Sequence, residues 1–172
     1  DLLVLCDEAY FDIRYEGAAH SLAALPDMAE RCLVLYTFSK KYAMTGWRLG
    51  AAVGPCELIE AIGKLNVNDE SCSNHFVQYA GLEALTGPQD GARKILETLK
   101  GRRDRCHELL VSIPGVRCFR PASTFYLFPN VTELMPGNAD YEGFRRAALL
   151  VSLTLPGRDG YEVGRALRSR KE

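Results

Sequence analysis

The sequence has almost no net charge, and this removes several classes of partner. Its 172 residues include 21 lysines and arginines against 22 aspartates and glutamates, a formal net charge of −1. Binding to nucleic acid or to an acidic membrane surface calls for a strongly basic balance, which this chain lacks. It also shows no apolar run long enough to span a bilayer and no signal peptide. We therefore expect no nucleic-acid partner, no membrane partner and a cytoplasmic location.

Cysteine spacing argues against a structural zinc site. The six cysteines are Cys6, Cys32, Cys56, Cys72, Cys106 and Cys118. No two of them form a C-x-x-C pair, and the three histidines lie in no metal-binding pattern. Several cysteines fall within apolar runs, so free thiols in a reducing compartment are the simplest interpretation. We expect no metal site.

Three apolar runs in the first third of the chain predict the strands of a sheet. They occupy residues 2–6, 32–38 and 47–53. Between the first two runs, residues 22–31 have helical spacing, and a polar loop is expected around Ser39 and Lys40. Strands that alternate with helical segments indicate an α/β fold with a mainly parallel sheet.

Helices dominate the next part of the chain. The predicted helices are 57–65, 74–85, 88–113 and 141–150, and the predicted strands after residue 113 are 116–119, 124–128 and 151–155. The pattern changes near Pro88, which predicts a boundary between residues 1–90 and a small α+β domain at 91–172. The long helix joins the two parts.

Polar side chains flank each of the three apolar runs. Asp7 and Tyr10 follow the first run, Thr37-Phe38-Ser39-Lys40 closes the second, and Arg48 lies at the start of the third. In open α/β sheets, ligands bind at the carboxyl ends of the strands. A carboxylate, an amine and a guanidinium that converge there can hold a phosphorylated, aldehyde-bearing cofactor.

The segment at residues 37–50 makes this pattern specific. Its sequence, Thr-Phe-Ser-Lys-Lys-Tyr-Ala-Met-Thr-Gly-Trp-Arg-Leu-Gly, resembles the cofactor-lysine signature of the class I/II aminotransferases, which use pyridoxal 5′-phosphate (PLP) on fold type I. Asp-Glu-x-Tyr at residues 7–10 resembles the second marker of that family, and residues 66–85 and 124–129 are also similar to it. The resemblance implies that residues 1–90 are the C-terminal part of the large PLP-binding domain and 91–172 the small C-terminal domain.

The resemblance also implies roles for the residues around the cofactor ring. Lys40 would hold the cofactor as a Schiff base and, once released, shuttle protons. Lys41 is the rival, but the family places the reactive lysine directly after a serine. Asp7 would face the pyridine nitrogen, and Tyr10 would hydrogen-bond the 3′-oxygen. A core tyrosine is the alternative for Tyr10.

The resemblance also implies which residues would bind the cofactor phosphate and the substrate carboxylate. Arg48 would bind the phosphate as a planar fork, with the hydroxyls of Thr37 and Ser39 nearby. Arg165 is the first choice for the substrate carboxylate and Arg168 the second, and a solvated arginine is an equal alternative at this place.

Three further side chains are interpreted as structural before they are interpreted as functional. Asn74 is expected to cap a helix, and Phe125 or Tyr126 to pack on a strand. Lining of the pocket is the alternative for all three.

These residues predict a PLP-dependent aminotransferase that moves an amino group between an L-amino acid and a 2-oxoacid, as a homodimer in the full-length parent. A PLP-dependent β-lyase on the same fold and a truncated, non-catalytic copy are the alternatives. The sequence opens without Met, within a strand pattern. We therefore expect a fragment, inactive alone, because the family draws further cofactor-binding groups from upstream segments.

Overall fold

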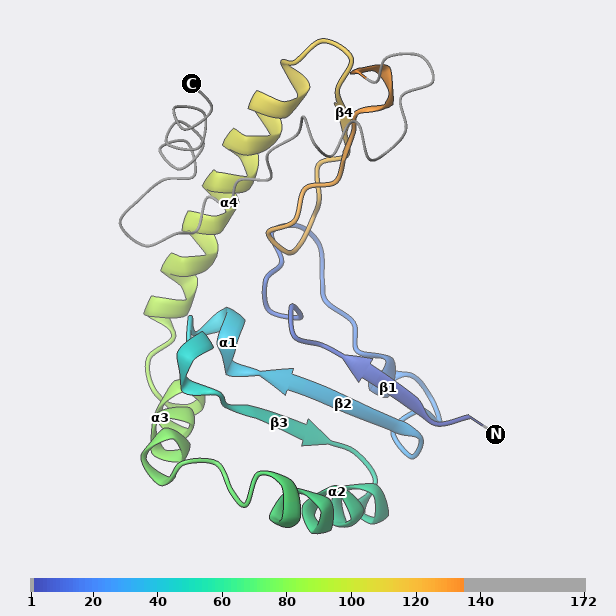
Figure 1. Ribbon diagram of the computed structural model, residues 1–172, viewed down its shortest axis with the longest axis vertical. Coiled ribbons are helices and arrows are strands. Elements are labelled where there is room, and N and C mark those ends of the chain that lie inside the picture. Colours follow the sequence, from blue (N-terminus) through green and yellow to red (C-terminus); the bar gives the residue numbers. More distant parts are fainter. Residues whose placement is uncertain (1, 135–172) are drawn as a thin grey trace, which may run out of the picture. The chain divides into compact units, whose positions relative to one another are not determined.

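The structure, a computed structural model, describes residues 2–134 (Figure 1). Two compact units divide the chain. Of the described residues, the first unit contains 2–112 and 118–129, and the second 113–117 and 130–134. All of the predicted site residues that the structure describes lie in the first unit.

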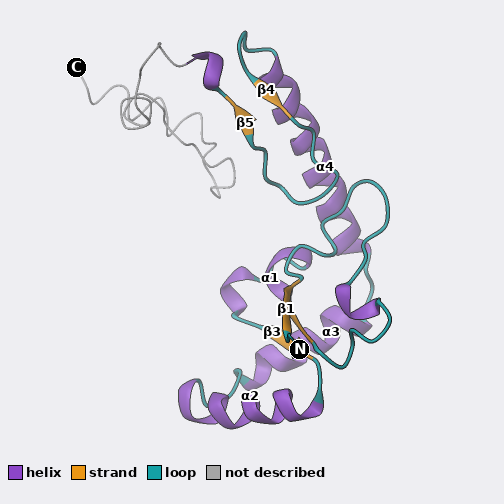
Figure 2. Cartoon of the chain, turned by 90° about the vertical axis from the view of Figure 1, so that its right-hand side faces the viewer, coloured by secondary structure: helices purple, strands orange, loops and turns teal. Residues whose placement is uncertain are grey.

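The first unit contains a three-stranded sheet in the order β1-β2-β3. Its strands are β1 (Val4–Asp7), β2 (Cys32–Thr37) and β3 (Gly50–Val53). β1 runs parallel to β2, as the sequence predicted, with Asp7 opposite Leu35. β3 is antiparallel to β2, so that Thr37 pairs with Gly50. Figures 1 and 2 show α2 (Cys56–Asp69) next to β3, on the side away from β1.

The antiparallel pairing of β3 follows from the short connection that precedes it. The regular elements of this connection are α1 (Phe38–Lys41) and the 3₁₀ turn η2 (Thr45–Trp47). A parallel return would use a crossover helix about as long as the strand, but α1 rises only about 6 Å, whereas the six residues of β2 extend for about 20 Å. The chain instead turns back at the end of β2, and β3 begins there.

Close contact between β2 and β3 requires a residue without a side chain at the start of β3. A Cβ atom on Gly50 would lie 2.8 Å from the backbone oxygen of Tyr36. The β2 side of the contact is well packed, because Cys32 and Phe38 at either end of the strand are 1% and 5% exposed. The leucines at β1 are far less covered, with Leu3, just before the strand, 67% exposed and Leu5, within it, 64% exposed.

The prediction of a helix at residues 22–31 was wrong. Only a single 3₁₀ turn, η1 (Leu22–Ala24), forms there, and Ser21 caps it. Leu25 is extended because it precedes Pro26, and a residue before proline is pushed out of the helical region. Asp27 then takes a left-handed conformation with φ 59°, so the helix cannot resume.

The predicted later helices were confirmed, with shifted ends. They are α2, α3 (His75–Thr86) and α4 (Asp90–Val111). α4 continues through Gly91 and Gly101, where an added Cβ would meet nothing within 4 Å. It stops shortly before Pro114, which cannot continue a helix.

After α4 the chain forms a two-stranded sheet from β4 (Arg117–Cys118) and β5 (Pro129–Asn130), followed by η3 (Thr132–Leu134). The strand predicted at 124–128 was wrong, because Thr124 adopts φ 62° and breaks the extended run. The predicted helix at 141–150 and strand at 151–155 lie outside the described residues. The small domain at 91–172 and its boundary near residue 90 stay predictions.

Candidate active site

The predicted site residues gather at one edge of the sheet. Asp7 is the last residue of β1 and Thr37 the last of β2, while Gly50 opens β3 beside Thr37. Lys40 lies in α1, directly after β2, and Arg48 lies two residues before β3. The sheet thus brings a carboxylate, an amine and a guanidinium to the end where β1 and β2 present their carboxyl termini.

The short helix α1 is held in place from both ends. Thr37 is its N-cap, and the Thr37 hydroxyl accepts a hydrogen bond from the Ser39 N–H at 3.1 Å. The ring of Phe38 is buried and packs against Tyr36 and Tyr42, with centroid distances of 5.6 Å and 5.8 Å. Lys40 therefore projects from a fixed backbone, although α1 is only one turn long.

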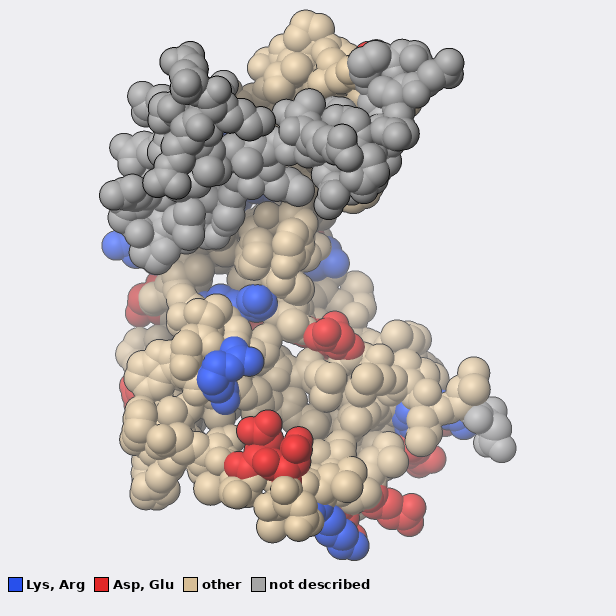
Figure 3. Space-filling model, viewed as in Figure 1, with Lys and Arg blue, Asp and Glu red and all other residues tan. Residues whose placement is uncertain are grey.

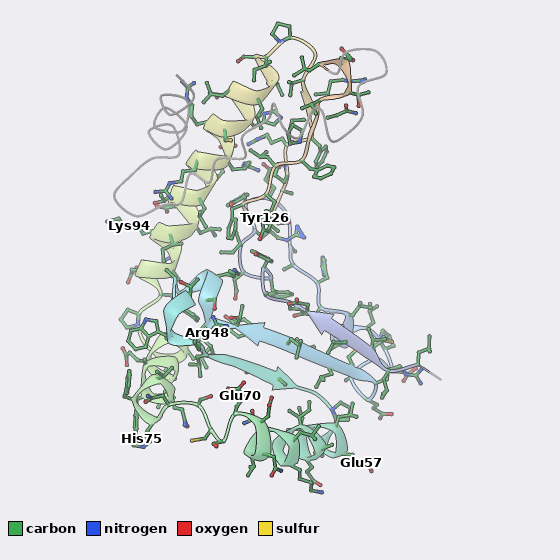
Figure 4. The ribbon with its side chains drawn as sticks, in the orientation of Figure 1. Arg48, Glu57, Glu70, His75, Lys94 and Tyr126 are labelled. Atoms are coloured by element: carbon green, nitrogen blue, oxygen red, sulfur yellow. The ribbon has the colours of Figure 1, made fainter. Side chains whose placement is uncertain are left out.

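Aromatic rings surround the amine of Lys40. Its Nζ lies 5.3 Å from the ring centroid of Tyr10 and 5.9 Å from that of Phe125. Tyr10 makes edge contacts with Phe125 and Tyr126, and its hydroxyl lies 2.6 Å from the Tyr126 hydroxyl. Figure 4 labels Tyr126 on the segment between β4 and β5. Among the described residues, Lys40 forms no ion pair, so aromatic faces rather than carboxylates define its surroundings.

The neighbouring Lys41 has a different environment. Its Nζ forms an ion pair with Asp12 at 3.3 Å, and Asp12 also accepts a hydrogen bond from the Tyr36 hydroxyl at 3.0 Å. Burial alone would lower the pKa of Lys41, but the Asp12 carboxylate outweighs burial and raises that pKa above its ordinary value. A lysine reacts as a nucleophile only when neutral, so the ion pair with Asp12 disfavours Lys41 in that role.

Tyr10 is a protonated phenol at neutral pH. Burial is the main cause that raises the pKa of Tyr10, to about 12, and the hydrogen bond with Tyr126 and the nearby Asp7 carboxylate act in the same direction. A neutral phenol can donate a hydrogen bond to an oxygen of a ligand. Tyr10 therefore has the protonation state that its predicted role requires.

Arg48 borders a groove whose lining includes neither Asp7, Tyr10 nor Lys40. The groove has a volume of about 850 Å³, and Trp47, Arg48, Asn66, Glu70, Asn74 and Phe76 are among the residues that line it. Figure 4 labels Arg48 and Glu70, which approach the groove from η2 and the end of α2. The Arg48 guanidinium donates to the Thr45 carbonyl at 2.8 Å, and its backbone is left-handed with φ 53°. Non-glycine residues held in this region often mark functional sites.

The remaining predicted residues are placed as follows. The exposed Asp7 carboxylate accepts a hydrogen bond from the Ala9 N–H at 3.1 Å. Ser39 is half-buried on α1, and its hydroxyl has no partner among the described residues. Asn74 is the N-cap residue of α3, but its side chain makes no capping hydrogen bond. Arg165 and Arg168 lie outside the described residues, so the carboxylate-binding role stays a prediction.

Tyr126 was not predicted from the sequence to contact Tyr10. Its segment, residues 124–129, had already been noted as similar to the aminotransferase family, but strand packing was the favoured interpretation. The contact with Tyr10 joins residues 116 positions apart, and no local pattern reports such a contact.

Three further observations concern surface charge, membrane-spanning helices and metal sites. Lysine, arginine, aspartate and glutamate side chains are interspersed over the face shown in Figure 3, as the balanced composition requires. Within residues 2–134, no helix is both long and apolar enough to cross a membrane, and no group of three or more His, Cys, Asp or Glu side chains is suited to a metal ion.

Comparison with known proteins agrees with this geometry. An aspartate aminotransferase of Geobacillus stearothermophilus is 37% identical over 134 residues, and one of Musicola paradisiaca (strain Ech703) is 38% identical over 140 residues. These alignments cover 77% and 81% of this chain but 34% and 35% of the relatives. The crystal structure of the aspartate aminotransferase from Rhizobium meliloti matches with a TM-score of 0.73 at 36% identity, over 77% of this chain and 34% of that one.

The chain thus spans about a third of the length of the curated relatives it matches. The profile of the family described as aminotransferase class I and II matches residues 1–152. With the site at the sheet edge, these similarities establish that the chain belongs to the class I and II aminotransferases and carries part of their fold-type I architecture.

Proposed function

We propose that this chain serves a PLP-dependent transfer of an amino group between an L-amino acid and a 2-oxoacid, with Lys40 as the cofactor-binding lysine. The observation that carries the proposal is the contrast between two adjacent lysines. Lys41 is bound to Asp12, whereas Lys40 has no carboxylate partner among the described residues and lies beside Tyr10 at the edge of the sheet. The family and the named relatives support the reaction class.

The side chains at this edge complement the parts of PLP. Arg48, at the rim of a groove, offers a guanidinium for the phosphate. Asp7 offers an exposed carboxylate for the pyridine nitrogen, and Tyr10 a protonated hydroxyl for the 3′-oxygen. Thr37 and Ser39 add hydroxyls next to Lys40. The donor set therefore fits a phosphorylated pyridine aldehyde.

Bound PLP supplies an electron sink for the bond that breaks at the substrate Cα. The chain supplies the groups that hold it and move protons. The Asp7 carboxylate would face the ring nitrogen and favour its protonated form, and Tyr10 would donate a hydrogen bond to the 3′-oxygen. The Lys40 amine would accept the proton from the substrate Cα and hold it as the general base. The rings of Tyr10 and Phe125, whose centroids lie 5.3 Å and 5.9 Å from the Lys40 Nζ, would border the amine at this position.

We also propose that the whole protein acts as a homodimer in the cytoplasm, and that Arg165 binds the carboxylate of the amino acid and of the 2-oxoacid. The dimer and the carboxylate arginine rest on the resemblance to the family, whose relatives carry about two thirds of their length outside the matched segment. The side-chain preference of the amino acid is left open.

Chemical trapping tests the assignment of the lysine. The purified protein is incubated with PLP, its visible spectrum is recorded, and the adduct is fixed with borohydride and mapped by mass spectrometry. We expect the label on Lys40, its loss in Lys40→Ala and its retention in the matched control Lys41→Ala. A label that survives Lys40→Ala, or that only Lys41→Ala removes, contradicts the proposal.

A second assay tests the reaction. Amino transfer that depends on an added 2-oxoacid supports an aminotransferase, whereas release of ammonia and pyruvate without an acceptor identifies a β-lyase and overturns the proposed reaction.

A further inference from the structure

The hydrogen bond between Tyr10 and Tyr126 joins the sheet edge to a segment that is distant in sequence. The two hydroxyl oxygens are 2.6 Å apart, and either can be the donor. Tyr10 is half-buried, whereas the side chain of Tyr126 is 59% exposed. Tyr126 has no need of this bond to satisfy its hydroxyl, since water could do so. The bond therefore matters mainly for what it does to Tyr10.

Backbone contacts fix the segment from which Tyr126 projects. The N–H groups of Tyr15 and Glu16 donate to the Ala122 carbonyl at 2.8 Å and 3.2 Å, and the Thr124 N–H donates to the Ile13 carbonyl at 2.7 Å. These bonds tie the chain that follows Tyr10 to the chain that precedes Tyr126. The Tyr126 N–H also lies 3.3 Å from the Thr124 hydroxyl, which accepts its hydrogen bond. The approach of the two rings is thus built into the fold.

The chemistry of the two hydroxyls sets the direction of the bond. Each phenol has one proton to donate and can accept as well. Without a ligand Tyr10 can donate to Tyr126, the direction that raises the pKa of Tyr10. If Tyr10 instead gives its proton to an oxygen of a bound ligand, the bond between the phenols must run from Tyr126 to Tyr10. A donor that is itself accepting a hydrogen bond is polarised and becomes a stronger donor. The charged or titratable groups that face Tyr10 are Lys40 from α1, Asp7 from β1 and Tyr126 itself.

We propose that Tyr126 is a positioning residue of this site, whose hydroxyl donates to Tyr10 and aims the Tyr10 proton at the 3′-oxygen of PLP bound to Lys40. The inference rests on the proposed function, because it needs the cofactor at Lys40. A stronger donor at the 3′-oxygen stabilises negative charge there. It therefore lowers the pH at which the bound cofactor changes between its protonated and unprotonated spectra.

A spectroscopic pH titration of the PLP-loaded protein tests this role in four variants. Tyr10→Phe removes the hydrogen bond to the 3′-oxygen. It should raise the spectral midpoint, the pH at which half of the bound cofactor has changed spectrum, by roughly one pH unit. Tyr126→Phe removes only the polarising bond and should raise it by roughly a third to a half of that amount. The double variant should match Tyr10→Phe alone, because Tyr126 acts through Tyr10. Tyr79→Phe is the matched control, since Tyr79 is similarly exposed at 62% and should leave the midpoint unchanged.

Each result decides the inference. A midpoint that Tyr126→Phe does not move, or that moves further in the double variant than in Tyr10→Phe, refutes it. If the unsubstituted protein shows no PLP spectrum at all, the proposed function fails first, and the two failures are thereby distinguished.

A readout without cofactor checks the contact itself. With ¹³Cζ-labelled tyrosine, the Tyr10 resonance, assigned by its loss in Tyr10→Phe, should shift in Tyr126→Phe and stay in place in Tyr79→Phe. An unshifted Tyr10 resonance in Tyr126→Phe means that the phenol–phenol bond is not formed, and it overturns the inference.

Discussion

Replacing Arg103 with methionine should destabilise the first unit far more than an equivalent change elsewhere on α4. Arg103 is the buried charged residue among those described, with a side chain only 1% exposed. Its guanidinium donates to the Pro121 carbonyl and to Glu16 Oε1, and its Nε lies 2.8 Å from Asp104 Oδ1. It also lies 4.6 Å from the ring centroid of Tyr15. Arg103 therefore connects α4 to the two segments, residues 13–16 and 121–124, whose backbone hydrogen bonds form the junction next to Tyr126.

The size of the effect follows from what each partner loses. The charged hydrogen bond to the Pro121 carbonyl contributes roughly 1.5–3 kcal/mol, and the contact with the Tyr15 ring about 1 kcal/mol. Glu16 and Asp104 are 50% and 30% exposed and also contact Arg120, so they can be solvated or paired again. Methionine keeps most of the aliphatic volume. We expect the free energy of unfolding to fall by roughly 2–4 kcal/mol.

Urea denaturation followed by circular dichroism measures this change. The matched control is Arg105→Met, because Arg105 lies on the same helix with a 70% exposed side chain and, within residues 2–134, pairs only with Glu108 in the next turn. The control should cost less than about 0.5 kcal/mol. Equal losses in the two variants, or a loss below about 1 kcal/mol for Arg103→Met, would show that Arg103 does not hold the junction.

Four further substitutions test particular features of the fold by the same denaturation assay, the last of them as a function of pH. Gly50→Ala should lower stability by about 1–3 kcal/mol, because its Cβ meets the Tyr36 backbone oxygen. Gly101→Ala, on the open face of α4, should raise stability by about 0.5–1 kcal/mol. A change of stability in the same direction in both variants refutes the close contact at Gly50. Thr124→Asn should raise stability by up to about 1 kcal/mol, because asparagine adopts the left-handed conformation at φ 62° more readily and its side-chain oxygen can replace the hydroxyl that accepts from the Tyr126 N–H. A clear loss contradicts this. Burial raises the pKa of Asp104, but Arg120, Arg103 and Lys100 outweigh it and lower that pKa below its ordinary value. The ionised carboxylate therefore stabilises the fold at neutral pH, and this stability is lost as pH falls below about 4. Asp104→Asn should flatten the fall of unfolding free energy with pH in the acid range, and an unchanged fall refutes the assignment.

Local pattern was sufficient to predict the elements whose causes are local. The strands at β1 and β2 follow from apolar runs, and the later helices from their periodicity. The pattern failed at residues 22–31, where spacing suggested a helix but Pro26 and the left-handed Asp27 ended it after one turn. It also failed to predict α1, because a single turn depends on its Thr37 cap and on the packing of Phe38.

Local motifs likewise predicted some residues of the candidate site and not others. Asp7, Lys40 and Arg48 fall in short motifs at predicted strand ends, so their arrival at one edge could be predicted. The distinction between Lys40 and Lys41 had to come from the family's order of residues, and the ion pair of Lys41 with Asp12 now gives it a physical reason. Tyr126 could not be assigned, since its contact with Tyr10 depends on the course of α4 and of the chain beyond it.

The backbone bonds between Ile13 and Thr124 and between Tyr15 and Ala122 also constrain the order of assembly. The strands β1, β2 and β3 beside Lys40 have all been synthesised once the chain reaches residue 53. The aromatic partners of Tyr10 must wait for the whole of α4 and the segment after it. Pairing across so long a loop is slow to nucleate, so on a ribosome the amine of Lys40 is open to solvent well before its aromatic wall closes.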